Sequence, residues 1–154
     1  YVMSGVVARG IQGVAQTNFY LHAKSDDQSN IVLTYPQTGM AQVSDKPYFL
    51  ANVRAGAEFK MILKVQTREN KDVYVAYVPA SDLQANTATG NYLYFPLYTV
   101  PAGGGWMQII ADVAGDLQKR QIEYLSTTWL SFHGREISLD NIGFSSNVLQ
   151  TSLK

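Results

Sequence analysis

The fold class is decided by residues 59–78, which read FKMILKVQTRENKDVYVAYV. The first eight residues alternate between two faces, and one face carries the apolar side chains of Phe59, Met61, Leu63 and Val65. The opposite face carries the polar side chains of Lys60, Lys64 and Gln66. Because side chains alternate with a period of two in a β-strand, this stretch predicts a half-buried antiparallel strand. The charged turn at residues 68–72 and the apolar run that follows it predict a hairpin partner, which ends before Pro79.

Further short strands are predicted on both sides of this hairpin, at residues 30–35, 48–53, 91–97, 106–113, 128–134 and 137–144, with edge strands expected within residues 1–24. Between them, residues 101–105 read as a flexible glycine loop and residues 81–90 as a polar loop with a helical turn. Residues 115–124 are expected to form a helical turn or a long connection. About seven to ten short strands without a long helix predict an all-β fold, namely one antiparallel β-sandwich of jelly-roll type over residues 1–154.

The composition limits the classes of function. The chain has 154 residues, of which 46% are apolar and 16% charged, with 12 acidic and 12 basic side chains. This neutral balance gives no long-range attraction to nucleic acid or to an anionic membrane, so neither is a predicted partner. No apolar run approaches the roughly 18 residues of a membrane span. The absence of cysteine excludes disulfides and thiolate chemistry.

The first residues show no basic segment followed by an apolar stretch, and the chain begins with Tyr1 rather than Met. We therefore expect the sequence to be a segment of a larger multidomain protein, in which an export signal could lie upstream.

The last third of the chain carries a family resemblance. Three strand-like runs follow one another there, WMQIIADV (residues 106–113), TWLSFHG (128–134) and ISLDNIGF (137–144), with Asp116-Leu117 after the first. This order resembles the C-terminal strands of the carbohydrate-binding modules with a galactose-binding-like β-jelly-roll fold, over roughly residues 55–146. The resemblance implies non-catalytic binding of a polysaccharide or oligosaccharide by a secreted or cell-surface protein of bacterial type. It also implies covalently linked catalytic or adhesive domains, and a mainly structural role for Trp106.

Strand phase indicates which side chains would meet a sugar. If Leu130 and Phe132 face the core, then Trp129, Ser131 and His133 face outward. The same reasoning turns Tyr74, Tyr92 and Tyr94 outward. Aromatic rings stack on the C–H face of a sugar, while polar side chains bond its hydroxyls. The predicted ligand contacts are Trp129, His133, Tyr74, Tyr92, Tyr94, Lys64, Gln66 and Arg135.

These residues also have simpler interpretations. Trp129 could pack under a loop or against a sheet edge, since Trp is largely buried on average. The tyrosines could be ordinary strand residues with high β propensity. The lysines and Gln66 could form a solvated face, or they could contact the carboxylates of an acidic glycan.

The resemblance further implies a structural calcium ion held through Asp140, within the Asp140-Asn141 pair, near the N-terminal strand. Calcium requires about six to eight oxygen ligands, and the nearest acidic pair in the N-terminal part of the sequence is Asp26-Asp27. The alternative is that Asp140 and Asn141 bond backbone groups at a bulge. No other cofactor is predicted.

An enzyme is not predicted. His22 and His133 are the two histidines, which is too few for a zinc site, and there is no nucleophile elbow. A glycosidase pair could in principle be drawn from the carboxylates of Asp112, Asp116, Glu123, Glu136 and Asp140. A jelly-roll polysaccharide lyase using Tyr, Lys and His is a further alternative. The main alternative function is a structural or adhesive sandwich that binds a protein, because tyrosine-rich faces also suit protein interfaces.

Overall fold

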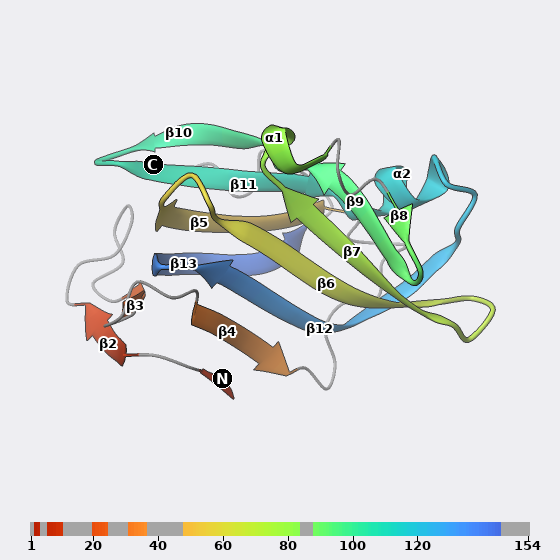
Figure 1. The fold of residues 1–154 in the computed structure, drawn as a ribbon, viewed down its shortest axis with the longest axis horizontal. Coiled ribbons are helices and arrows are strands. Elements are labelled where there is room, and N and C mark those ends of the chain that lie inside the picture. Colours follow the sequence, from red (N-terminus) through yellow and green to blue (C-terminus); the bar gives the residue numbers. More distant parts are fainter. Residues whose placement is uncertain are drawn as a thin grey trace.

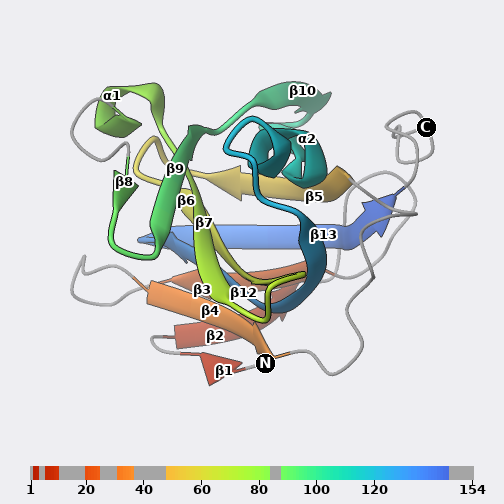
Figure 2. The ribbon, with the colours of Figure 1, turned by 90° about the vertical axis from the view of Figure 1, so that its right-hand side faces the viewer.

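A computed structural model describes residues 2–3, 6–10, 20–24, 31–36, 48–83 and 88–145. These residues form two β-sheets, here called sheet A and sheet B (Figures 1 and 2). The strands of sheet A are, in spatial order, β1 (Val2–Met3), β4 (Ile31–Pro36), β12 (Tyr124–Gly134), β6 (Lys60–Thr67), β7 (Asp72–Val78), β9 (Tyr92–Pro96) and β8 (Ala88–Thr89). The strands of sheet B are β10 (Thr99–Gly103), β11 (Trp106–Asp112), β5 (Tyr48–Ala55), β13 (Glu136–Ser145), β3 (Tyr20–Lys24) and β2 (Val6–Gly10).

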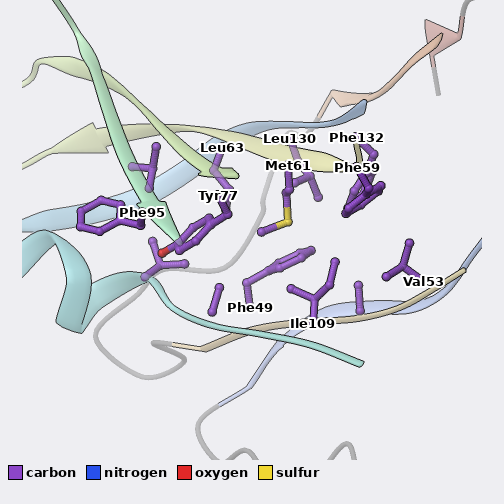
Figure 3. Close-up of a cluster of buried hydrophobic side chains, with 14 of the residues drawn as sticks. Phe49, Val53, Phe59, Met61, Leu63, Tyr77, Phe95, Ile109, Leu130 and Phe132 are labelled. Carbon is purple, nitrogen blue, oxygen red and sulfur yellow. The ribbon is translucent and has the colours of Figure 1, made fainter. Parts of the chain in front are cut away.

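The two sheets pack face to face, and in both views β6, β7 and β9 run at an angle across β5 and β13 (Figures 1 and 2). The core between them is apolar: Met61, Leu63 and Leu130 of sheet A point toward Phe49 and Ile109 of sheet B (Figure 3). The prediction of an all-β sandwich is confirmed. It follows from the alternation in β6, where every second residue is buried in this core.

The predicted hairpin is present, with Met61 opposite Tyr77 and Val65 opposite Val73. One local prediction was wrong, and one pairing departs from the antiparallel arrangement of the other strands. β9 pairs with β7 in parallel. Residues 101–103 belong to β10 rather than to a loop, and the glycine turn begins at Gly103, which has a φ of 89°. Gly103, Gly104 and Gly105 all have positive φ, which glycine adopts without steric cost, so they form the tight turn into β11.

Two short helices complete the described structure: α1 (Ala80–Leu83) and α2 (Val113–Gln118). Asp112 caps α2 by accepting a hydrogen bond from the Gly115 N–H at 3.0 Å. The buried Tyr77 donates its hydroxyl to Asp116 at 2.9 Å and so ties α2 to sheet A. Within the ranges given above, no helix is long and apolar enough to cross a membrane.

Candidate functional site

The outer face of sheet A collects most of the residues predicted to bind a ligand. Trp129 of β12 lies opposite Lys64 of β6, Lys64 lies opposite Tyr74 of β7, and Tyr74 lies opposite Tyr92 of β9. Side chains directly opposite each other across paired strands share a face. The adjacent residues Leu130, Leu63 and Val75 are buried in the core, so this row faces outward as predicted. We call Trp129, Tyr74, Tyr92 and Tyr94 the aromatic row.

Trp129 reaches this face through an irregularity in β12. Thr127 is buried opposite Val65, a core residue, whereas Trp129 lies opposite Lys64, so the register shifts between them. In a regular strand, residues 127 and 129 would share a face. The extra residue of the bulge lets Thr127 point inward and Trp129 point outward.

The tyrosine rings of the row stand side by side on the sheet. The centroids of Tyr74 and Tyr92 are 4.7 Å apart with an interplanar angle of 12°, close to the spacing of about 4.8 Å between neighbouring strands. Two rings lying flat on the sheet would overlap at this separation, so the rings are upright and stacked. Tyr94 continues the row, with its centroid 6.2 Å from that of Tyr92. One face of Tyr74 is therefore covered by Tyr92.

Trp129 leans toward the tyrosines across β6. Its strand and that of Tyr74 are separated by two strand spacings, about 10 Å, yet the two ring centroids are only 6.3 Å apart. The rings meet edge to face, at 86°. Lys64 lies within the same group: its Nζ is 5.9 Å from the Tyr74 centroid and 3.6 Å from an Asp72 carboxylate oxygen.

A polar group continues the face along β12. His133 lies opposite Lys60, and the Oγ of Ser131 is 2.8 Å from the Nε2 of His133. We call Lys60, Ser131 and His133 the polar end. Burial first, and the nearby Lys60 ammonium second, lower the pKa of His133 to about 4, so the imidazole is neutral at pH 7. A serine bonded to a neutral histidine is the geometry of a nucleophile and its base, but Ser131 is 0% exposed and a polymer would not reach it.

The remaining predicted residues lie apart from the aromatic row and the polar end. Gln66 is on the same face at the far end of β6, where its amide N–H donates to Asn70 at 3.1 Å. Arg135 lies in the connection between β12 and β13, where its backbone N–H donates to Glu58 at 3.2 Å. Asp140 is on β13 in sheet B, so it is not part of the aromatic row. Trp106 opens β11 and is buried, with the Arg54 guanidinium 5.1 Å from its ring centroid.

The surroundings of Asp140 bear on the predicted calcium ion. Asp140 accepts a hydrogen bond from the Asn141 N–H at 2.9 Å, where the register of β13 shifts. The opposite residue, Asn52, is 1% exposed, and its Oδ1 has no hydrogen-bond donor among the described residues. An orphaned buried oxygen beside a carboxylate is a donor set that suits calcium. Asp140 and Asn52 would supply two of the ion's oxygen ligands, and the ion would satisfy the Asn52 amide oxygen.

The rest of the donor set is not defined by the described ranges. No group of three His, Cys, Asp or Glu side chains that could hold a metal occurs among them, and Asp26-Asp27 lies outside them. Calcium at Asp140 therefore stays a prediction.

Several acidic residues considered for catalysis have structural partners. Asp112 caps α2, and Asp116 accepts from Tyr77 and pairs with Lys119 at 3.3 Å. Glu123 pairs with Arg68 at 3.2 Å. That ion pair borders a cavity of about 300 Å³ between the β6–β7 turn and the segment before β12. Sequence reasoning missed this cavity, because it depends on two turns that are distant in the sequence.

No protein-family model and no curated protein sequence matches the chain. Among solved structures, it is similar to the enzymatically active domain of bacteriophage CBA120 tailspike protein 4, with a TM-score of 0.42 and 8% identity over 93% of this chain and 18% of that one. It is also similar to an exo-β-agarase, with a TM-score of 0.41 and 12% identity over 94% of this chain and 22% of that one. The chain thus spans about a fifth of each of these structures. Similarity at this level does not transfer a function, so function has to be inferred from the chain's own residues.

Proposed function

We propose that this chain is a non-catalytic carbohydrate-binding domain that holds a polysaccharide along the outer face of sheet A. The observation that carries the proposal is the aromatic row. Trp129, Tyr74 and Tyr92 come from strands far apart in the sequence, and the sheet places them in contact on an outward face. All four side chains of the row are half-buried, so part of each ring remains free to contact a ligand, and a solvated sheet face needs no such cluster.

The parts of the row would act differently on a sugar. The indole of Trp129 is the group best suited to stack on the C–H face of a pyranose. The upright tyrosines offer ring edges and hydroxyls rather than flat faces, so they would bond the rim of sugar hydroxyls. Each aromatic contact contributes about 1 kcal/mol beyond its buried area. A single sugar would therefore bind weakly, and useful affinity requires several sugar units along the face.

The proposal includes a context for this binding. An extracellular protein that carries this domain beside a catalytic or adhesive domain would gain affinity for a polymer, because linkage raises the local concentration of the second domain on that polymer. The geometry of the polar end supports binding rather than catalysis, since Ser131 is buried and the imidazole of His133 is a weak base at pH 7.

Affinity electrophoresis in gels that contain a panel of polysaccharides tests the proposal. The wild-type protein should be retarded by at least one polymer, Trp129→Ala should lose the retardation, and Trp129→Phe should keep part of it. Tyr98→Ala is the matched control, because Tyr98 is 68% exposed and lies outside the aromatic row. Circular dichroism verifies that each variant is folded. Equal retardation of wild type and Trp129→Ala would remove Trp129 from the site, and no retardation by any polymer would overturn the proposed function.

A second candidate is a sandwich that binds a protein. It is favoured by the exposure of Tyr98 and Val100, which are 68% and 43% exposed at the start of β10. In the described part of sheet B, β10 is an edge strand that pairs with β11 alone. The same gels separate the two candidates, because a domain that binds only protein migrates alike with and without polysaccharide.

A further inference from the structure

We infer that the polar end of the outer face of sheet A is an anion subsite, so that the ligand is a glycan bearing carboxylate or sulfate groups. This inference rests on the proposed function and adds the chemical class of the ligand. Lys60 is the group that would bind the anion, and His133 would add a neutral hydrogen-bonding contact beside it.

The geometry puts this subsite within reach of the same ligand as the aromatic row. His133 is four residues beyond Trp129 on β12, about 13 Å at 3.3 Å per residue. Both side chains face outward, and Lys60 is directly opposite His133 on β6. Ser131, between them, is buried and bonded to His133, so it forms part of the floor rather than a barrier. A chain of several sugars lying along β12 would span both groups.

The charges on this face distinguish Lys60 from Lys64. Lys64 has a counterion, the Asp72 carboxylate at 3.6 Å. Among the residues that the structure describes, Lys60 forms no ion pair. The carboxylate of Glu58, two residues earlier in the sequence, accepts the Arg135 N–H. Lys60 as a whole is half-buried. Without a counterion among the described residues, its ammonium favours an anionic partner, because a charge-assisted hydrogen bond is about twice as strong as a neutral one.

His133 contributes without competing for the anion. Its lowered pKa keeps it uncharged at pH 7, so Lys60 supplies the charge of the polar end. The Nε2 of His133 is engaged by Ser131, which leaves Nδ1 as the second ring nitrogen. When the Ser131 hydroxyl donates to Nε2, the proton of the neutral ring is on Nδ1, and Nδ1 can donate to a ligand oxygen.

The test compares each anionic polysaccharide with its own neutral form in affinity gels near physiological salt. Polygalacturonate is paired with its fully methyl-esterified form and alginate with its carboxyl-reduced form, which test a carboxylate. Dextran sulfate is paired with dextran, which tests a sulfate. We expect an apparent Kd about ten-fold lower for the anionic member of at least one pair, as one charged hydrogen bond would give. The pair that shows the difference identifies the anion.

Three variants assign the effect to Lys60. Lys60→Gln should remove the preference for the anionic polymer, and Lys60→Arg should keep it. Lys119→Gln removes an exposed lysine at the C-terminal end of α2, where Lys119 pairs with Asp116, and should bind like wild type. A preference that survives in Lys60→Gln, or equal binding to the charged and neutral forms, overturns this inference while the proposed function stands. Binding to none of the polymers overturns the proposed function itself.

Discussion

Replacement of His133 by Gln should change how the free energy of unfolding depends on pH. The imidazolium form is disfavoured in the folded protein, first by burial and second by the Lys60 ammonium opposite it, and the pKa falls from about 6.5 to about 4. In the unfolded chain the imidazole is solvated and far from Lys60, so its pKa returns to about 6.5. Because the folded pKa is the lower one, the unfolded state takes up the proton first as the pH falls.

The sign and size of the effect follow from this difference. Above pH 6.5, His133 is neutral in both states and its contribution to stability is fully present. That contribution is lost as the pH falls from about 6.5 to about 4, and nothing more is lost below. One pKa unit corresponds to about 1.4 kcal/mol, so the whole shift from about 6.5 to about 4, without solvent screening, would correspond to about 3 kcal/mol of stability. His133 is only partly buried, and solvent screening reduces the expected loss to roughly 1–2 kcal/mol.

Urea unfolding of wild type and His133→Gln at about pH 7.5 and about pH 4.5 measures this loss. The stability of wild type relative to the variant should fall by roughly 1–2 kcal/mol between the two pH values. The second histidine, His22, is present in both proteins, so its titration cancels in the comparison. In Lys60→Gln, the free energy of unfolding should depend less on pH than in wild type, because the substitution removes the ammonium that is the second cause of the lowered His133 pKa. If the difference in the free energy of unfolding between wild type and His133→Gln were the same at both pH values, the reasoning would be refuted.

Three further predictions concern stability. Tyr77→Phe should lower the free energy of unfolding by about 1–2 kcal/mol, because it removes the hydrogen bond to the Asp116 carboxylate. The exposed control Tyr98→Phe should change the free energy of unfolding, measured in urea, by less than about 0.5 kcal/mol. Equal effects of the two substitutions would contradict the role of that hydrogen bond. Leu63→Ala should cost about 2–5 kcal/mol in the same assay, since Leu63 is fully buried, and a cost typical of a surface site would place it outside the core. Calcium should raise the Tm of wild type by about 5 °C but not that of Asp140→Asn, and a Tm unchanged by EDTA would argue against the ion.

The architecture could be predicted from the sequence where a strand is regular and half-buried. Alternation over residues 59–66 assigned each side chain of β6 to its face, and the inward positions of Leu93 and Phe95 turned Tyr92 and Tyr94 outward. The parallel pairing of β9 with β7 could not be predicted, because a strand shows the same alternation of side chains whether its neighbour runs parallel or antiparallel to it. The strand assignment of residues 101–103 was missed for a similar reason, since Pro and Gly read as loop residues but are tolerated at a sheet edge.

The site was predicted only in part, because phase gives the face of a residue but not its neighbours. Trp129, Tyr74 and Tyr92 become one group through the cross-strand register. The upright stacking of the tyrosines depends on side-chain rotamers, which the pattern of residues does not contain. The proximity of Lys60 to His133 likewise follows from register.

The bulge in β12 shows why register decides the chemistry of this face. If residues 124–134 formed a regular strand, Thr127 and Trp129 would share a face, and burial of Thr127 would place the indole in the core. The inserted residue places Thr127 and Trp129 on opposite faces of the sheet. It also sets the register between β12 and β6 after the bulge, so that Trp129 lies opposite Lys64 and His133 opposite Lys60. One backbone irregularity therefore brings the indole to the tyrosines and the imidazole to the Lys60 ammonium. The aromatic row and the polar end are thus two consequences of the same register, which is why one extended ligand is expected to contact both.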